Sequence, residues 1–259
     1  MRLLSIEETS IMTSMHILGF PRIGERRELK WVLEGYWKGE QSADAVQTVA
    51  RELRQRHWAM QAEAGCRYVT VGDFSLYDHV LDMSARLGVV PARFGWVGGE
   101  VDLDTYFRMA RGRAPSGRST FACEMTKWFD TNYHYIVPEL VPGQTFALSR
   151  HDLFEQVEEA KALGHAVKVV LLGPLTWLWL AKTQGDIAKL DLLDAILPVY
   201  GEILARLAGQ GVTWVQMDEP ILALDLPTPW RAAFERVYHV LQSAGVKLML
   251  ASYLSLIHI

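Results

Sequence analysis

Apolar residues along the chain alternate between short strand-like runs and longer stretches with helical spacing. The strand-like runs are His16–Gly19, Arg67–Val71, Phe121–Met125, Val167–Leu172, Thr213–Met217 and Lys247–Ala251. Helical spacing begins near Arg27 and recurs in the segments 42–64, 150–163, 192–207 and 229–243, with a shorter helix that ends near Leu87. Strands that alternate with helices in this way are typical of a parallel sheet covered by helices.

Six strand-helix units of this kind place the fold in the α/β class. Eight strands close a barrel of this type, and the strand at 247–251 has no following helix. We therefore expect a (β/α)8 TIM-barrel-type domain over residues 16–253 that is incomplete at its carboxyl end, with about six of the eight βα units present. Residues 1–15 are expected to be a disordered extension, and residues 254–259 a tail foreign to the domain. The polar stretch Gly95–Arg118 is expected to be a long loop with one short helix.

Composition narrows the class of protein. The chain has 259 residues, of which 50% are hydrophobic and 22% charged, and its formal net charge is -4. This balance is typical of a soluble globular protein and argues against a nucleic-acid surface, which normally carries a basic excess. The longest uncharged apolar run, Val169–Ala181, is interrupted by Gly173-Pro174, so no membrane segment is expected. Cys66 and Cys123 have no metal-ligand spacing, which indicates neither a disulfide nor a zinc site and favours the cytoplasm.

A basic cluster follows the first strand-like run. Four cations fall within nine positions, at Arg22, Arg26, Arg27 and Lys30. Side-chain cations in the first turn of a helix oppose its dipole, which suggests an anionic ligand. The alternative is a solvated basic face, because Glu25, Glu28 and Glu34 are close enough in sequence to pair with these cations.

A second candidate segment, residues 124–135, combines a cation with aromatic residues. Lys127 lies beside Trp128 and Phe129, and Tyr133 and Tyr135 follow. A flat heteroaromatic ligand that also bears carboxylates suits this set, since the rings can stack on it while the lysine neutralises charge. The alternative is that the aromatic residues belong to the core and Lys127 extends to solvent.

Acidic residues follow two of the predicted strands. Asp218 and Glu219 come directly after the strand at 213–217, and Asp73, Asp78 and His79 come after the strand at 67–71. Only one of two adjacent side chains in a strand can face inward, so at most one of these two residues is expected to contact a ligand or metal. The alternative is that one of them caps the next helix. The second group is compatible with an acid-base pair or with hydrogen-bonded turns.

Six segments of the chain carry long, specific motifs: GFPRIGERRELK (19–30), VGDFSLYDHVL (71–81), GRAPSG (112–117), EMTKWFDTNYHYIVPE (124–139), LLGPLTWLWL (171–180) and VQMDEP (215–220). In this order they resemble the amino-terminal domain of cobalamin-independent methionine synthase. The similarity covers residues 16–253. The family resemblance implies a (β/α) barrel in an enzyme that transfers a methyl group from 5-methyltetrahydropteroyl-polyglutamate to homocysteine, forming methionine.

The resemblance also implies roles for individual residues. Arg27, Glu28, Leu29, Lys30 and Lys127 match family positions that bind the folate, and weaker candidates are Arg22, Trp128, Asp218 and Glu219. No catalytic residue and no metal ligand is expected in this chain, and Asp218 and Glu219 are expected to be structural remnants of a duplication.

The resemblance places the remaining chemistry outside this chain. Zinc, held by a His/Cys/Glu/Cys set, and homocysteine are expected in a carboxyl-terminal domain that the chain lacks, and no cobalamin is needed. The chain alone is expected to be inactive, and the full-length protein to be a cytoplasmic monomer without nucleic-acid or membrane partners. Two alternatives stay open: a stand-alone barrel module that binds folate or another polyanion, and a phosphate-handling barrel lyase or isomerase with Lys127 as its Schiff-base lysine.

Overall fold

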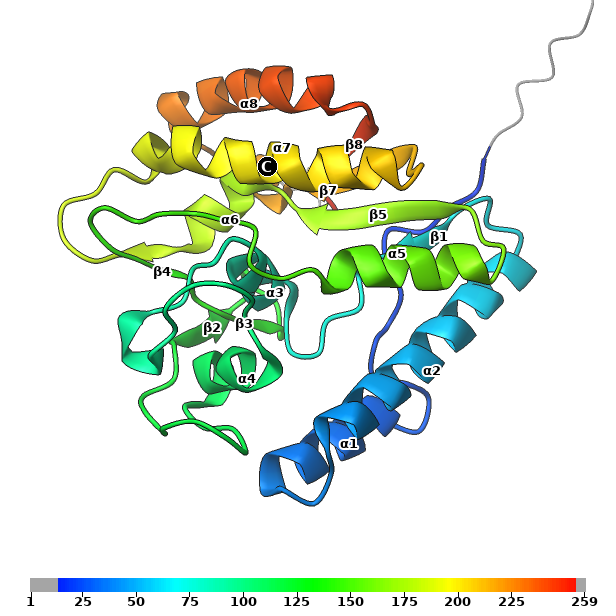
Figure 1. Cartoon of the computed structure of the whole chain (residues 1–259). Helices are drawn as coiled ribbons and strands as arrows, with labels where there is room; N and C mark the ends of the chain where they lie inside the picture. The colour runs from blue at the N-terminus through cyan, green and yellow to red at the C-terminus, as the bar shows by residue number, and fades with distance from the viewer. Residues whose placement is uncertain (1–13, 255–259) are drawn as a thin grey trace, which may run out of the picture.

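A four-stranded parallel sheet forms the centre of the protein. The computed structural model describes residues 14–254, and the sheet has the strand order β1-β5-β7-β8 (Figure 1). Its strands are β1 (Val69–Val71), β5 (Val167–Leu172), β7 (Trp214–Asp218) and β8 (Lys247–Ala251). Every residue of β1 and β5 is buried, as expected for strands that helices cover. The predicted α/β fold with a parallel sheet is confirmed.

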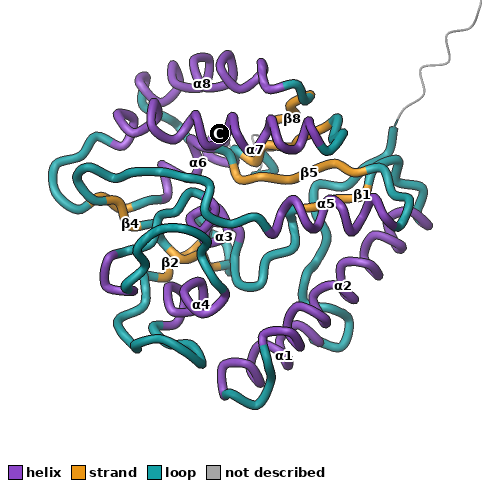
Figure 2. The backbone as a smooth tube through the Cα atoms, in the orientation of Figure 1, coloured by secondary structure: helices purple, strands orange, loops and turns teal. Residues whose placement is uncertain are grey.

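Eight α-helices and four short 3-10 helices surround this sheet in the described part of the chain (Figure 2). The α-helices are α1 (Glu28–Lys38), α2 (Ala43–Glu63), α3 (His79–Arg86), α4 (Leu103–Arg111), α5 (Asp152–Ala162), α6 (Pro174–Leu180), α7 (Leu193–Gly209) and α8 (Thr228–Leu241). The 3-10 helices are η1 (Ala92–Phe94), η2 (Lys189–Leu192), η3 (Pro220–Ala223) and η4 (Gln242–Ala244). Helix α5 packs on β1 and β5, and α7 packs against α8. None of the described helices is both long enough and apolar enough to cross a bilayer.

The predicted strand at His16–Gly19 is wrong. This segment is irregular, and side chains of the sheet bind its backbone in place of a neighbouring strand. The ammonium group of Lys168 donates to the carbonyl oxygen of Ile17 at 2.6 Å, and the amide of Gln216 donates to that of Leu18 at 2.9 Å. Because distant side chains satisfy these carbonyl groups, the segment needs no ladder of backbone hydrogen bonds.

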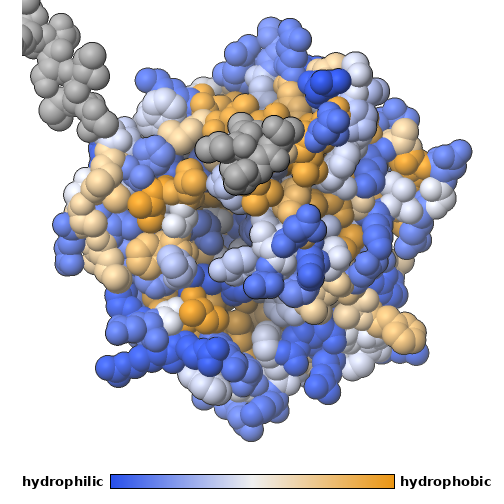
Figure 3. Space-filling view, turned by 180° about the vertical axis from the view of Figure 1, so that it is seen from behind, coloured by the Kyte–Doolittle hydropathy of each residue, from blue (hydrophilic) through white to orange (hydrophobic). Residues whose placement is uncertain are grey.

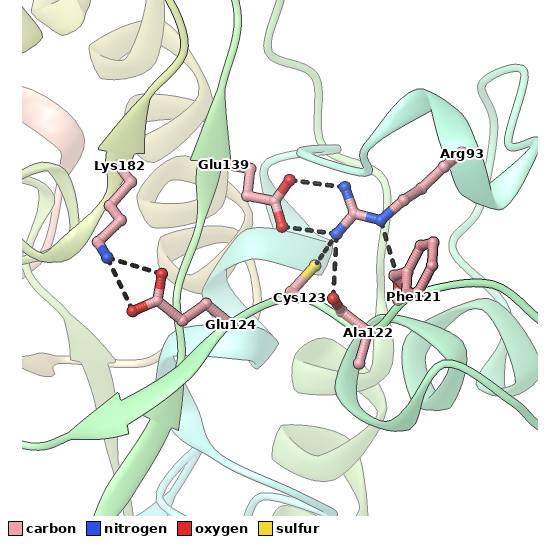
Figure 4. Close-up of polar contacts among 7 residues, drawn as sticks. All are labelled: Arg93, Phe121, Ala122, Cys123, Glu124, Glu139 and Lys182. Atoms are coloured by element: carbon pink, nitrogen blue, oxygen red, sulfur yellow. Dashed lines mark hydrogen bonds and ion pairs between the residues drawn. The ribbon is translucent and has the colours of Figure 1, made fainter.

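The predicted strand at Phe121–Met125 is also wrong in position. Strand β2 (Met125–Lys127) pairs antiparallel with β3 (His134–Ile136) in a separate two-stranded sheet. The preceding residues bind Arg93, whose guanidinium donates to the carbonyl oxygen of Phe121 at 2.9 Å and forms an ion pair with Glu139 at 2.6 Å (Figure 4). These contacts occupy the backbone that a strand would have used. Glu139 lies in β4 (Glu139–Leu140), which pairs in parallel with β6 (Lys182–Thr183).

The main sheet has four strands, where the sequence pattern predicted six strand-helix units. Strands β1 and β5 pair directly, although residues 72–166 lie between them in the chain. Residues 14–254 form no closed barrel. The predicted loop at 95–118 does contain one short helix, α4, as expected. The expected extension at 1–15 and tail at 254–259 lie largely outside the described residues.

Candidate functional site

Two neighbouring cavities lie at the carboxyl ends of the central strands. Each has a volume of about 280 Å³, and both are lined by Asp73, His79 and Tyr253. The first also contacts Asp218 at the end of β7, and the second reaches Arg22. Carboxyl ends of parallel strands are the usual place for ligand sites in α/β proteins. The molecular face opposite to the view of Figure 1 is hollowed near its centre (Figure 3).

Asp218 and Glu219 point in different directions. Glu219 is 0% exposed, and its carboxylate accepts hydrogen bonds from the backbone N–H of Thr176 at 2.7 Å and from the hydroxyl of Tyr238 at 2.8 Å. It therefore caps the amino terminus of α6. Gly173 permits this approach, since a Cβ atom there would lie 2.1 Å from the Glu219 carboxyl carbon. Burial raises the pKa of Glu219 to about 7.

Asp218 is the member of the pair that lines a cavity. Its carboxylate accepts a hydrogen bond from the amide of Gln216 at 2.7 Å. Burial raises the pKa of Asp218 to about 7, although the nearby Lys168 favours the charged form. The capping alternative describes Glu219, and a contact between Asp218 and a ligand stays a prediction.

The acidic residues after β1 are engaged in hydrogen bonds that hold the chain. Asp73 accepts from the backbone N–H of Phe20 at 2.7 Å. Asp78 caps α3 and also accepts from the N–H of Ile136 at 3.0 Å. Burial raises the pKa of Asp78 to about 7 and lowers that of His79 to about 4. Asp78 therefore fits the interpretation as a hydrogen-bonded turn, since it accepts from Leu81 within its own turn, whereas Asp73 is held by the distant Phe20.

Arg22 and Trp128 meet at the second cavity. The guanidinium of Arg22 donates to the carbonyl oxygens of Ser75 at 3.0 Å and of Tyr77. Trp128 is buried, and its ring lies edge-on to His79 with 4.4 Å between ring centroids. Two segments that are more than a hundred residues apart in sequence therefore border one cavity.

The basic segment Arg27–Lys30 forms the start of α1. Arg27 is exposed and precedes the first turn, whereas Leu29 is 0% exposed and belongs to the core. Glu28 forms an ion pair with Arg56 at 2.6 Å. Lys30 lies 3.6 Å from Glu34, which is the pairing that a solvated helix face would show.

Lys127 is exposed on β2, directly opposite His134 in the two-stranded sheet. Neither Lys127 nor Arg27 nor Lys30 lines the two cavities. Their sequence neighbours Arg22 and Trp128 do, so the second cavity lies between the basic and the aromatic segments.

Residues 14–258 match a family model described as "Cobalamin-independent synthase, N-terminal domain". The chain belongs to this family. Among solved structures, it is similar to a B12-independent methionine synthase from Shewanella sp. W3-18-1, determined in complex with selenomethionine, at 16% identity and a TM-score of 0.56. It is also similar to a putative vitamin-B12 independent methionine synthase from Listeria monocytogenes, at 12% identity and a TM-score of 0.58.

These structural similarities concern the fold alone, and the matched proteins are longer. The alignment covers 82% of this chain and 52% of the Shewanella chain, and 91% of this chain and 66% of the Listeria chain. The chain therefore spans about half of the first protein and about two thirds of the second. In residues 14–254, no group of three or more His, Cys, Asp or Glu side chains is arranged to hold a metal ion.

Each of the two candidate segments of this synthase domain contains a residue with a strained backbone. Within the described range, Arg27 (φ 62°) and Phe129 (φ 51°) are the only residues other than glycine with positive φ. Left-handed conformations cost a non-glycine residue roughly 1–2 kcal/mol, and such strain tends to collect at functional sites. One strained residue precedes α1, and the other follows Lys127 by two positions.

Two charged residues near the cavities were not singled out from the sequence. Lys168 is 1% exposed in β5, and burial lowers its pKa to about 8. Arg86 is buried beside the first cavity, where its Nε has no hydrogen-bond partner. A lysine inside the otherwise apolar run Val167–Leu172 is a signal that could have identified Lys168.

Proposed function

We propose that this domain binds the methyl donor of a cobalamin-independent methionine synthase, 5-methyltetrahydropteroyl-polyglutamate, and that its parallel sheet is part of a (β/α) barrel. The proposed enzyme transfers the methyl group to homocysteine. In this proposal the chain supplies binding and orientation, and the zinc and homocysteine sites lie outside it. The full-length monomer and the cytoplasmic location are part of the same proposal.

The observation that carries the proposal is that some of the candidate cations, unlike Lys30, have no carboxylate partner within residues 14–254. In the described residues, Arg51, Arg54 and Arg56 all form ion pairs with carboxylates. No carboxylate of that part of the chain forms an ion pair with Arg26, Arg27 or Lys127. A polyglutamate tail is a string of carboxylates, which such cations can bind through charge-assisted hydrogen bonds.

The cavity between the two segments supports binding of the pterin. Trp128 and Tyr133 line it, and Tyr133 is 78% exposed. Aromatic side chains stack on flat rings, and the guanidinium of Arg22 and the buried carboxyl of Asp78 provide polar groups at the same cavity. The ring would lie here while the tail extends toward α1.

Calorimetry with folates that carry one or three glutamates tests the proposal. The charge argument requires tighter binding of the longer tail, and the difference must shrink as salt is added because exposed charges are screened. Equal affinities for the two ligands, or no binding of either, would contradict the proposal.

The Schiff-base alternative receives less support from the geometry. A lysine nucleophile is usually activated by desolvation, and Lys127 is exposed. Lys168 is desolvated, but its ammonium group already donates to the carbonyl of Ile17. Borohydride trapping with a carbonyl substrate would revive this alternative if it labelled either lysine.

A further inference from the structure

The loop that follows α4 carries the motif Gly112-Arg113-Ala114-Pro115-Ser116-Gly117, to which the proposed function assigns no role. Its first cation, Arg111, ends α4 and lies over the ring of Trp37 in α1, 3.6 Å from the ring centroid. Trp37 in turn packs edge-on against Phe107, with 5.5 Å between ring centroids. The end of α4 is therefore held against the helix that begins with the basic segment.

The loop has a fixed shape. The N–H of Thr120 donates to the carbonyl of Gly112 at 2.8 Å, which closes the loop on itself. Gly112 has φ +76°, and a Cβ atom there would lie 2.3 Å from the carbonyl oxygen of Thr120, so only glycine fits. Asp104 accepts from the backbone N–H of Ser116 at 3.1 Å and also from the hydroxyl of Tyr36 in α1. The carboxylate thereby links the loop to α1, so the loop backbone that carries Arg113 is already held when a ligand binds.

The charges around Arg111 are unbalanced. Burial lowers the pKa of Arg111, and the neighbouring Arg113 lowers it further, against the attraction of Tyr77 and Glu34. Glu34 already forms an ion pair with Lys30 at 3.6 Å. Within the described residues, neither Arg111 nor Arg113 forms an ion pair with a carboxylate. Glu34 is therefore paired with Lys30 while it also attracts Arg111, and Arg113 adds a further positive charge next to Arg111.

We propose that Arg111 and Arg113 extend the anion site of α1 and bind the outer carboxylates of the polyglutamate tail, so that they set the preference for tail length. This inference rests on the proposed function. Trp37 orients the guanidinium of Arg111, which lies near enough to Glu34 in α1 to be attracted by its carboxylate. A tail bound along α1 would supply the carboxylates that these two arginines lack among the described residues. Arg111 and Arg113 are therefore determinants of specificity, with no part in the chemistry.

The test compares the dissociation constants of methyltetrahydrofolate with one and with three glutamates in the wild-type protein and in Arg111→Gln. We expect Arg111→Gln to weaken binding of the triglutamate by about tenfold, as for loss of one charge-assisted contact, and to change monoglutamate binding by less than about twofold. Arg111→Lys should recover part of the lost preference because it keeps the charge. Glu34→Gln should bind the triglutamate more tightly, since it removes the competing carboxylate.

The controls separate failure of this inference from failure of the proposed function. Arg231→Gln removes an exposed cation from α8 and should leave both constants unchanged. A wild-type protein with no tail preference contradicts the proposed function. A wild-type protein that prefers the triglutamate while Arg111→Gln keeps the full preference overturns the inference, as does an equal loss for both ligands. If Arg111→Gln fails to fold, Arg113→Gln decides the question, because Arg113 is exposed and its replacement should also reduce the preference.

Discussion

The acidic end of β7 and the cationic start of α1 differ in whether their charged side chains have partners inside the protein. Glu219 is enclosed, and its carboxylate accepts from Leu175, Thr176 and Tyr238. Arg27 is exposed and has no carboxylate partner within the described residues, and its own backbone is strained. The carboxyl group of Glu219 is held by internal donors, whereas a cation without a carboxylate partner at the surface is available to a ligand. The difference therefore lies in the hydrogen-bond and ion-pair partners of each charged group.

The largest change in the free energy of unfolding is expected at Glu219, the acidic residue whose carboxylate has internal hydrogen-bond donors. Glu219→Ala leaves the N–H groups of α6 and the hydroxyl of Tyr238 without their acceptor. Unsatisfied buried donors cost about 1–3 kcal/mol each, so the free energy of unfolding should fall by at least about 3 kcal/mol. Urea denaturation measures this loss. Glu235→Ala, at an exposed position of α8, is the control and should change the midpoint little. A stable Glu219→Ala protein would show that the carboxylate is not structural.

The next largest change is expected in ligand affinity, at a cation that has no carboxylate partner within the described residues. Lys127→Glu should weaken binding of the triglutamate folate by on the order of 2 kcal/mol, because it places a like charge where a carboxylate binds. The fold should be unaffected, since Lys127 is exposed. Calorimetry gives the affinity, and Arg231→Glu provides the same change of charge on α8. Unchanged affinity would remove Lys127 from the binding site.

A smaller change is expected in how stability depends on pH when Asp218 is replaced. The pKa of Asp218 is raised by burial to about 7, so the folded state keeps its proton in a range where the unfolded state, with a pKa near 4, loses it. The contribution of Asp218 to stability must therefore fall as pH rises from about 4 to 7, and Asp218→Asn should remove this part of the decline. Glu219 and Asp78, whose pKa values burial also raises to about 7, keep their parts. The variant should gain roughly 1–2 kcal/mol over wild type between pH 6 and pH 8, because the folded-state pKa of about 7 lies about one unit above pH 6. Thermal unfolding at both pH values measures this gain, with the exposed Asp225→Asn as control. A pH-independent difference would mean that Asp218 is ionised throughout.

The smallest effect concerns backbone strain. Arg27→Gly should stabilise the protein by up to about 1 kcal/mol, because glycine adopts φ 62° without steric cost. The same variant should bind the triglutamate more weakly, since it removes a cation. Arg26→Gly, which changes the same charge one position earlier, should weaken binding without stabilising the fold. If Arg27→Gly is destabilised, the strain at this position is not real.

Local sequence patterns were sufficient for several elements. Strands β5 and β8 have the bounds that the pattern predicted, because each is a continuous run of strand-forming residues bounded by turns. The segments His16–Gly19 and Phe121–Met125 have similar apolar character, yet neither forms the predicted strand. Their carbonyl groups bind Lys168 and Arg93, and these partners come from distant parts of the chain. A local pattern cannot report such a contact.

The sequence by itself determined the α/β class, the family motifs and the residues that carry charge. It placed Arg27, Lys30 and Lys127 among the candidates, since cations and aromatic residues cluster visibly there. Only the tertiary structure decided which charges have partners, because an ion pair such as Arg54 with Glu159 joins residues 105 positions apart. Helical and strand periods act between neighbours in the chain and can be read locally, whereas the satisfaction of a charge depends on how the whole chain packs.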